Sequence, residues 1–376
     1  MITANKPSTQ RETLPDWRQS LRDAVTDPCE LLALVGLPQL TERLPVAEAG
    51  FALKVPRGFV QRMRHGDPHD PLLLQVLPQL AELDDAPGFT RDAVGDLAAV
   101  QAHGVLHKYD GRALLIAAGS CAVNCRYCFR RHFPYAEELA AVHAWREAID
   151  CLANDTSIRE AILSGGDPLV LSTQKLTDLT DALRGVPHVI RLRIHSRLPV
   201  VLPERIDDAF CAWLSTLPLQ RVVVLHANHP NELDASVEAA CVRLREAGAT
   251  LLNQSVLLRG VNDNVAALSD LMRAFVECRI KPYYLHHGDL APGTVHLRTT
   301  LAEGQALMRQ LRGRISGLCQ PDYVIDIPGG AGKSPVGPNY VLAAQNTAPD
   351  AGDAAAETRY RIVDYCGEVH LYPPET

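Results

Sequence analysis

Three cysteines, Cys121, Cys125 and Cys128, stand at C-x-x-x-C-x-x-C spacing in the segment CAVNCRYC. Thiolates at this spacing can bind three irons from one tight loop, and cysteine is the usual protein ligand of iron-sulfur clusters. Three protein ligands leave a fourth iron free. A zinc site is the alternative, but structural zinc is usually closed by four ligands. The sequence holds no second C-x-x-C, although His132 could complete such a site.

A lysine in the glycine-rich segment DIPGGAGKSP is the second candidate for chemistry. The segment is not a phosphate-binding GxxxxGK[ST] loop, because Ile327 occupies the position of its first glycine. Pro335 also lies where the helix of such a loop would begin. Lys333 is therefore either a solvated lysine or one that forms a Schiff base with pyridoxal phosphate (PLP).

The elements that must position these residues alternate between short apolar runs and amphipathic, helix-like stretches. This alternation indicates an α/β fold around a parallel sheet. Several βα units in series favour a partial or full (β/α) barrel, although strand order alone separates a barrel from a doubly wound sheet. The predicted strands are ALLIAA from Ala113, EAILS from Glu160, VIRLRIH from Val189, RVVVLH from Arg221, LLNQSVLL from Leu251, PYYLH from Pro282 and YVIDI from Tyr323.

Polar or glycine-rich residues follow almost every predicted strand: the cysteine segment, SGGD, HSR, HANH, HHGD and DIPGGAGK. In β/α barrels the active site is built from the loops at the carboxyl ends of the strands. The plainer interpretation is that loops are simply polar. The repetition of His, Asp and Gly at successive strand ends favours a shared site.

Three regions are expected along the chain. Residues 1–106 read as a helical amino-terminal region, which Asp-Pro and Pro-Gly pairs at Asp27, Asp70 and Pro87 break into short helices. Residues 107–340 would form the barrel with the lysine loop. Residues 341–376 would be a linker, rich in Ala, Asp, Thr and Pro after Gln345, and a carboxyl-terminal closing strand.

Composition narrows the function classes. The 376 residues are 47% hydrophobic and 22% charged, enough for a barrel-sized core. The formal net charge is −7, with no basic block, which argues against nucleic acid as a partner. No apolar run is long enough for a membrane span, and the first residues lack a secretion signal. We therefore expect a cytoplasmic protein, in which clustered cysteines indicate metal or catalysis before disulfides.

The cysteine segment, with the aromatic Tyr127 just before its last cysteine, resembles the radical S-adenosylmethionine (SAM) superfamily. Five further motifs, SGGDPL, HANHPNE, NQSVLLRGVND, YYLHHGDL and PGGAGKSP, occur in order and together resemble the lysine 2,3-aminomutase family. The amino-terminal part is more similar to the branch that makes β-lysine for elongation factor P. The resemblance implies a radical SAM barrel and an isomerase that interconverts L-lysine and β-lysine. It also implies a [4Fe-4S] cluster, SAM, a 5′-deoxyadenosyl radical and lysine bound to PLP as an aldimine.

The resemblance also implies roles for individual residues. Cys121, Cys125 and Cys128 would hold the cluster, and Lys333 would be the catalytic, PLP-binding lysine. The remaining cofactor residues are Tyr109 and Arg112 for PLP, and Ser164, Gly165, Gly166, Asp167, His226 and Gln254 for SAM. The plain alternatives are a simple turn for SGGDP, a core histidine for His226 and a surface charge for Arg112.

Three charged residues would bind the substrate. By resemblance, Arg130 would pair with the substrate carboxylate, while Asp289 and Asp326 would receive a distal ammonium. Two carboxylates aimed at one site repel each other unless a cation lies between them, which suits a dibasic amino acid. A solvated turn for Asp289 and a strand-end cap for Asp326 are the alternatives.

The sequence departs from the family at two places. The tail offers only Cys366, which removes support for the intersubunit zinc site of relatives with a cysteine-rich tail. His286 replaces a tyrosine of the free-lysine branch and resembles the elongation-factor branch. Two alternative functions stay open besides the elongation-factor role: a non-catalytic metal-binding barrel and a radical enzyme without aminomutase activity. An external electron donor and a homo-oligomer, dimer or tetramer, are also implied.

Overall fold

The computed structural model describes residues 16–45, 51–140, 145–345 and 359–372. Its main sheet has ten strands in the order β1 to β10, so every strand lies beside its neighbour in the chain. The strands from β3 to β9 are parallel, whereas β1, β2 and β10 (Gly332–Pro335) are antiparallel additions at the edges. Sequential order excludes the doubly wound sheet and confirms the β/α barrel.

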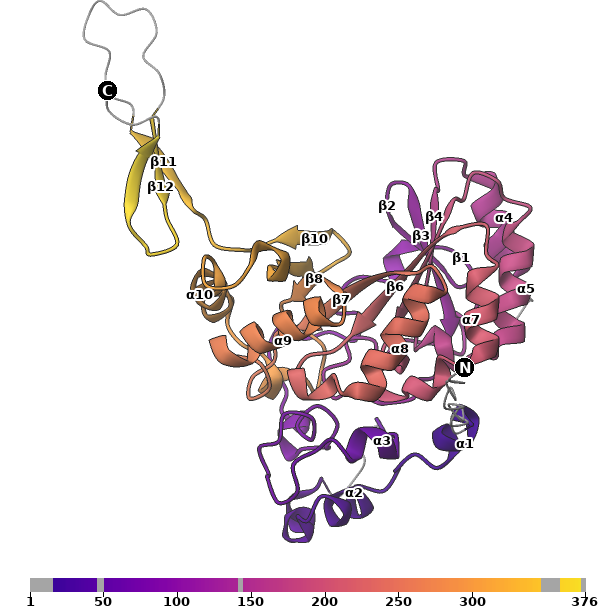
Figure 1. Ribbon diagram of the computed structural model, residues 1–376, viewed down its shortest axis with the longest axis horizontal. Helices are drawn as coiled ribbons and strands as arrows, with labels where there is room; N and C mark the ends of the chain where they lie inside the picture. Colours follow the sequence, from indigo (N-terminus) through magenta and orange to yellow (C-terminus); the bar gives the residue numbers. More distant parts are fainter. Residues whose placement is uncertain (1–15, 46–50, 141–144, 346–358, 373–376) are drawn as a thin grey trace, which may run out of the picture.

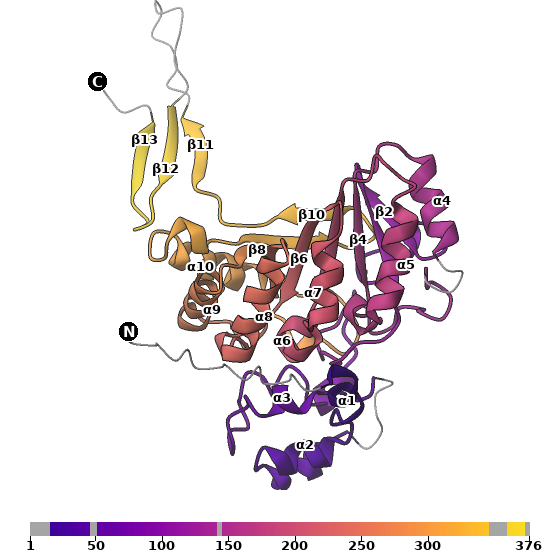
Figure 2. The same cartoon turned by 45° about the vertical axis from the view of Figure 1, so that its right-hand side comes forward.

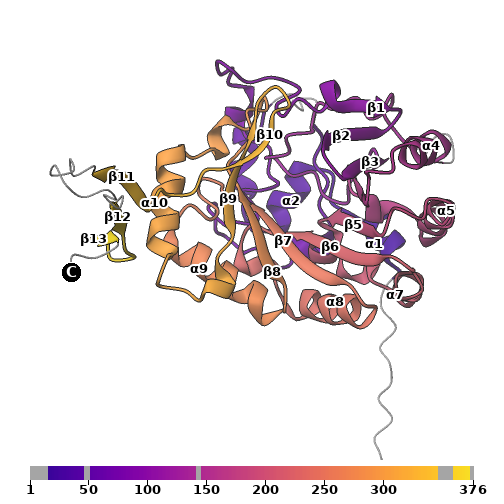
Figure 3. The same ribbon diagram turned by 90° about the horizontal axis from the view of Figure 1, so that it is seen from above.

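The seven parallel strands coincide with the seven predicted ones. Within the described residues β1 and β10 are the two edges of the sheet and do not pair with each other, so the barrel is partial. Figure 3 shows the curved sheet from above, with β9 and β10 at one side and β1 and β2 at the other. The parallel strands are β3 (Arg112–Ala118), β4 (Glu160–Gly165), β5 (Arg191–Ser196), β6 (Gln220–His226), β7 (Thr250–Val256), β8 (Lys281–His286) and β9 (Asp322–Ile327).

Helices line one face of this sheet (Figure 3) and follow the strands in turn. Most of the longer ones begin at a side chain that accepts a hydrogen bond from the backbone of the first turn, such as Asp234 before α8 and Asn264 before α9. Helix α8 ends just before Gly248, whose φ of +84° suits glycine at a helix end. The helices are α4 (Arg146–Asn154), η4 (Pro168–Val170), α5 (Thr173–Leu183), α6 (Leu198–Val201), η5 (Pro203–Arg205), α7 (Asp208–Ser215), η6 (Pro230–Glu232), α8 (Ala235–Glu246), α9 (Val265–Glu277), η7 (Val295–Leu297), α10 (Leu301–Leu311) and η8 (Gly317–Cys319).

The amino-terminal region consists of short helices followed by a hairpin. Asp27 caps α2 with Pro28 in its first turn, which is the break that the sequence predicted. Residues 71–77, which belong to the region expected to be helical, form turns instead. Pro78 disfavours a helical conformation only at Leu77, the last of them. The elements are α1 (Trp17–Arg22), α2 (Pro28–Leu34), η1 (Pro38–Arg43), α3 (Arg57–Val60), η2 (Leu80–Leu83), η3 (Leu97–Ala99), β1 (Val100–Ala102) and β2 (Val105–Tyr109), so the predicted boundary at 106 falls inside β2.

The amino-terminal region lies against the carboxyl ends of the parallel strands. The loop after β3 donates from the Asn124 amide to the Lys54 carbonyl at 3.0 Å and from the Arg126 amide to the Gln75 carbonyl at 2.8 Å. Figures 1 and 2 show α1, α2 and α3 as a separate layer at one end of the barrel. The cysteine loop is therefore enclosed between the barrel and this layer.

The carboxyl-terminal segment does not close the barrel, which corrects the sequence-based expectation. The edge of β9 is already occupied by β10, and β12 (Arg359–Val363) and β13 (Val369–Tyr372) pair with β11 (Val341–Gln345) in a separate three-stranded sheet. This small sheet extends beyond α10 in Figures 1 and 2. The predicted linker at 346–358 lies outside the described residues. In the described chain, no helix has the length and apolar character that a membrane crossing requires.

Candidate active site

The three clustered cysteines lie in the loop that leaves β3 at the carboxyl end of the barrel. All three are free thiols and partly buried. Burial and the neighbouring Asp167 raise the pKa of Cys121 well above its usual range, and burial and Cys125 raise that of Cys128 to about 11. A metal or cluster that binds Cys121 and Cys128 must therefore itself supply the positive charge that favours their thiolate forms.

The spacing of the three sulfurs discriminates between zinc and a cluster. Around one zinc ion, thiolate sulfurs lie about 3.8 Å apart, because each Zn–S bond is about 2.3 Å. In the described residues, only Asp364, Glu368 and His370 form a group of three metal-ligating atoms within 4.8 Å of one another. The cysteine trio is more widely spaced than one zinc ion requires, which fits ligands on separate irons of a cluster.

Arg197, from the HSR motif at the end of β5, supports the cysteine loop. Its guanidinium donates to Cys125 Sγ at 2.7 Å and to Tyr127 Oη at 2.6 Å. On its other side it donates to Glu232 at 3.0 Å and to Gln75 Oε1 at 2.8 Å. The contact with Arg197 fixes the position of the Cys125 sulfur within the loop. Sequence reasoning noted the HSR motif but gave Arg197 no role.

Two glycines at the end of β4 allow the cysteine loop to approach the sheet. Gly165 has φ +112°, and a Cβ there would lie 2.6 Å from the Ala118 carbonyl oxygen. A Cβ on Gly166 would overlap with the backbone of Ser120, whose carbonyl accepts from the Asp167 amide at 2.9 Å. The SGGD turn is thus more than a simple turn, because it fixes the loop that carries the cysteines.

The carboxylate of Asp167 is hydrogen-bonded to other residues of the chain. It accepts hydrogen bonds from Ser196 Oγ at 2.7 Å and from the amides of Arg197, Leu198 and Leu169. These bonds connect the end of β4 to the end of β5. The predicted SAM contact of Asp167 therefore competes with a structural role that the sequence did not reveal.

Buried polar atoms without partners line the neighbouring strands. The sheet register places His226 opposite Gln254, and both His226 Nε2 and Gln254 Oε1 are buried without a hydrogen-bond partner among the described residues. Burial lowers the pKa of His226 to about 3, so its ring is neutral. His195 on β5 packs edge-on against it, with ring centroids 5.7 Å apart. Buried polar atoms usually have hydrogen-bond partners, so a polar ligand such as SAM would supply the partners that these two atoms lack.

A second charged group gathers around Lys333. Because β10 runs antiparallel to β9, Lys333 lies opposite Asp326, and Nζ donates to Asp326 Oδ1 at 2.9 Å. Asp326 Oδ2 lies 3.3 Å from His286 Nδ1. Burial and the charge of Asp326 raise the pKa of Asp289 to about 7, and Asp289 Oδ1 is buried without a partner in the described chain. The structure therefore brings together the lysine and both predicted carboxylates.

Tyr109 and Arg112 adjoin the same lysine. The Lys333 amide donates to Tyr109 Oη at 2.7 Å, and the Arg112 guanidinium stacks 4.3 Å from the Tyr109 ring centroid. A Cβ on Gly332, which has φ +86°, would lie 3.0 Å from that ring. A partly exposed lysine beside an arginine and a hydroxyl fits a phosphate-bearing aldehyde such as PLP.

Arg130 links the cysteine loop to the buried charges of the amino-terminal region. Its Nε donates to Asp96 Oδ2 at 2.7 Å and its Nη1 to Ser164 Oγ at 3.0 Å. Lys108 Nζ holds the other oxygen of Asp96 at 2.7 Å. Sequence reasoning missed Asp96 and Lys108, because a single charged residue outside a recognisable motif carries no signal of burial.

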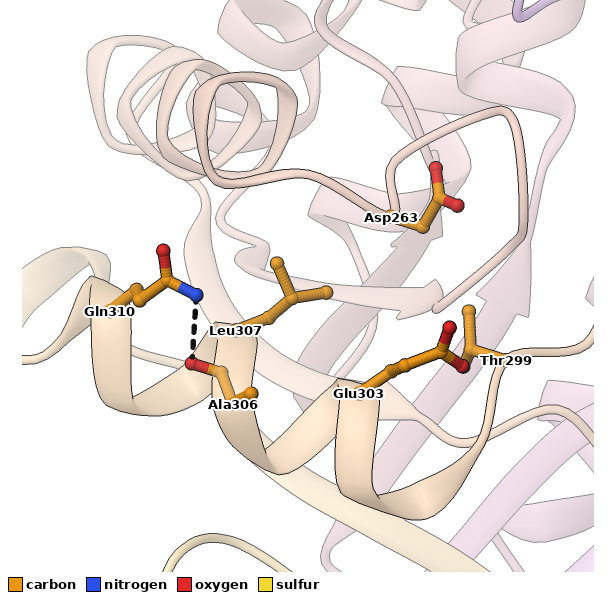
Figure 4. Close-up of a pocket in the computed structure, with 6 residues that line it drawn as sticks. All are labelled: Asp263, Thr299, Glu303, Ala306, Leu307 and Gln310. Carbon is orange, nitrogen blue, oxygen red and sulfur yellow. Dashed lines mark hydrogen bonds between the residues drawn. The ribbon is translucent and has the colours of Figure 1, made fainter.

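A surface pocket elsewhere is not part of this site. It lies between α10 and the loop that precedes α9, and Figure 4 shows its six lining residues: Asp263, Thr299, Glu303, Ala306, Leu307 and Gln310. None of them is a predicted site residue.

Comparison with known proteins decides the family. The chain is 44% identical to L-lysine 2,3-aminomutase of Escherichia coli over 338 residues, which cover 89% of this chain and 97% of that protein. It is 36% identical to the L-lysine 2,3-aminomutase of Clostridium subterminale, over 87% of this chain and 79% of that one. The chain belongs to the lysine 2,3-aminomutase family. The predicted resemblance is thereby confirmed.

Two family models agree with this assignment. The model described as lysine-2,3-aminomutase matches residues 308–348, and a 4Fe-4S single cluster domain matches residues 110–188, which include the three cysteines. A radical SAM methyltransferase from Sphaerobacter thermophilus matches with a TM-score of 0.42 and 19% identity, over 58% of this chain and 68% of that chain. Lysine 2,3-aminomutases are radical SAM isomerases, and the cofactors of this family member are a [4Fe-4S] cluster, SAM and PLP.

Proposed function

We propose that this chain is an L-lysine 2,3-aminomutase that interconverts L-lysine and β-lysine. The observation that carries the proposal is the grouping of Asp289 and Asp326 around Lys333 in a barrel whose mouth also holds the cysteine loop. The two carboxylates provide a site for a second cation, which among common amino acids favours lysine.

Separate groups of residues would hold the cofactors. Cys121, Cys125 and Cys128 would bind the cluster. The SAM group consists of Ser164, Gly165, Gly166, Asp167, His226 and Gln254, and the PLP group of Lys333, Tyr109 and Arg112. When bound, SAM at the cluster supplies a 5′-deoxyadenosyl radical, and PLP supplies a ring that delocalises an unpaired electron.

The residues of the chain bind and orient the substrate. Arg130 receives the substrate carboxylate with the guanidinium edge that now donates to Ser164, while Asp96 keeps its other edge fixed. Asp326 and Asp289 receive the distal ammonium. Lys333 Nζ must lose a proton and leave Asp326 before it can react with an aldehyde, so the same carboxylate is free for the substrate afterwards.

The proposal extends to the setting of the enzyme. An external electron donor must supply the electron for SAM cleavage, and we propose that the protein works in the reducing cytoplasm, where its ten free cysteines are stable. We also propose a homo-oligomer, because Tyr360, Leu371 and Tyr372 of the three-stranded sheet are exposed apolar residues.

The test is an anaerobic reaction. The protein is reconstituted with iron, sulfide and PLP, then mixed with SAM, a reductant and L-lysine, and β-lysine is measured by mass spectrometry. β-Lysine from the wild-type protein and none from Lys333→Ala supports the proposal. A cluster-bearing, PLP-loaded protein that makes no β-lysine would overturn the substrate, and a colourless protein with stoichiometric zinc would overturn the chemistry.

A further inference from the structure

His286 lies between the two halves of the site, at the carboxyl end of β8. One ring nitrogen, Nε2, is in hydrogen-bond contact with Gln254 Nε2, and the other, Nδ1, faces Asp326 Oδ2 at 3.3 Å. The residue is buried, with 8% of its surface exposed. A chain of contacts therefore runs from Gln254 through His286 and Asp326 to Lys333.

These contacts fix which ring nitrogen carries the proton. Burial lowers the pKa of His286, so the ring is neutral near pH 7 and has a single N–H. The Gln254 amide nitrogen can only donate, which makes His286 Nε2 the acceptor. The proton is then on Nδ1, where it is donated to Asp326.

The N–H donated by His286 Nδ1 determines which carboxylate oxygen of Asp326 is free to face a cation. Burial alone would raise the pKa of Asp326, but the hydrogen bond from His286 and the charge of Lys333 outweigh it and hold the pKa well below its usual range. Because Oδ2 is engaged by His286, Oδ1 is left to face a cation. That cation is Lys333 here and the substrate ammonium in the proposed function.

We propose that His286 is a positioning residue for substrate specificity, which orients Asp326 toward the distal ammonium of lysine and couples that orientation to Gln254. The proposal rests on the proposed function. Gln254 is a proposed SAM contact, and its Oε1 is buried without a partner in the described residues. A ligand that binds Oε1 thus holds the same amide that orients His286, so SAM binding and lysine binding are linked through one ring.

The first test needs no cofactor or activity. Nitrogen-15 spectra of histidine-labelled, cofactor-free protein at pH 7 should contain one neutral ring with its proton on Nδ1 that is absent from His286→Phe. A His286 ring protonated on Nε2 would overturn the proposal.

The second test separates substrate binding from the rest of catalysis. In the reconstituted enzyme at saturating SAM, His286→Phe should raise the KM for lysine about tenfold or more, because Asp326 loses its orienting donor. Its iron content and PLP absorbance should stay unchanged. His286→Gln should recover most of the wild-type KM, since an amide can accept from Gln254 and donate to Asp326.

A matched control and a double variant complete the test. His188→Phe removes another histidine, whose Nε2 contacts the Leu152 carbonyl at 2.9 Å, and should leave the lysine KM unchanged. Gln254→Ala should raise the lysine KM in the wild-type background but not in His286→Phe. The His286 proposal alone is overturned in two cases, both with a wild-type enzyme that makes β-lysine. In the first, His286→Phe keeps the wild-type lysine KM. In the second, the effects of the His286 and Gln254 substitutions on the lysine KM are additive. A wild-type protein that makes no β-lysine overturns the proposed function itself.

Discussion

Lys333 and Asp326 are cross-strand neighbours on β10 and β9 and also an ion pair, with Nζ and Oδ1 2.9 Å apart. The carboxylate proposed to bind the substrate ammonium thus holds the ammonium of the protein itself. Two ammonium groups at one carboxylate oxygen repel each other, so the departure of Lys333 Nζ favours the arrival of the substrate. This exchange underlies the first prediction.

Lys333→Ala should abolish β-lysine formation and leave the cluster intact, because the lysine is distant in sequence from the cysteine loop and is not one of its ligands. Lys333→Arg is the matched control for charge, since it keeps a cation beside Asp326 but cannot form a Schiff base. We expect both variants to be inactive, with iron content as in wild type. β-Lysine formation by Lys333→Ala would contradict the role of this residue.

Asp289 should make lysine binding pH-dependent. Its pKa is raised to about 7, so the carboxyl is neutral below that pH and attracts a cation only above it. The lysine KM should therefore fall about tenfold between pH 6 and pH 8. Asp289→Asn should show a high KM without this slope, and an unchanged pH profile in that variant would remove Asp289 from the substrate site.

Asp289 should also make the folding stability depend on pH, and here the effect is opposite: stability falls as the pH rises, whereas lysine binding improves. In the lysine-free protein the raised pKa means that the folded state retains a proton that the unfolded chain loses near pH 4. The stabilisation is complete below about pH 4 and is lost as pH rises toward about 7. Melting temperatures of wild type should decline more between pH 5 and pH 8 than those of Asp289→Asn.

Gly166→Ala should disrupt the cysteine loop. The added Cβ would lie 2.8 Å or less from backbone atoms of Ser120, which cannot move without breaking the contact between the SGGD turn and the loop. We expect reduced iron content after reconstitution and a lower melting temperature. Gly58→Ala is the control, because a Cβ there meets nothing within 4 Å and an alanine suits helix α3.

The parallel strands were predictable because each is a continuous apolar run followed by polar residues. The edge strand β10 was not, since its sequence GKSP has neither alternation nor β-branched residues. That omission hid the pairing of Lys333 with Asp326, which depends on the antiparallel register. The sequence links these two residues only through the family resemblance.

The residues that support the cysteine loop could not be identified from the sequence, for a different reason. Glu82, Glu232 and Arg197 are separated by long stretches of chain, and nothing in their local sequence indicates burial. Charged residues are usually exposed, so a sequence pattern assigns them to the surface. Their role emerges only when the amino-terminal region packs on the barrel.

Glu82 makes the last prediction, because it anchors both arginines that flank the cluster ligands. It accepts from Arg126 Nε at 2.8 Å and from Arg131 Nη2 at 2.8 Å, and all three side chains are 1% exposed. Burial would raise the pKa of Glu82, but the two arginines outweigh it and lower the pKa, so the group is ionised at neutral pH. The carboxylate thus balances two buried cations.

Glu82→Gln leaves those cations without a countercharge, which in buried pairs costs about 3–5 kcal/mol of folding free energy. We expect that loss in urea unfolding of the cofactor-free protein, together with poorer cluster assembly, because Arg126 lies between Cys125 and Tyr127. Asp270→Asn is the control, since its pair with Arg273 is more than half exposed and screened by solvent. Equal effects of the two substitutions would mean that the buried group does not anchor the loop, and the cysteine loop would then depend on Arg197 and the glycine turn alone.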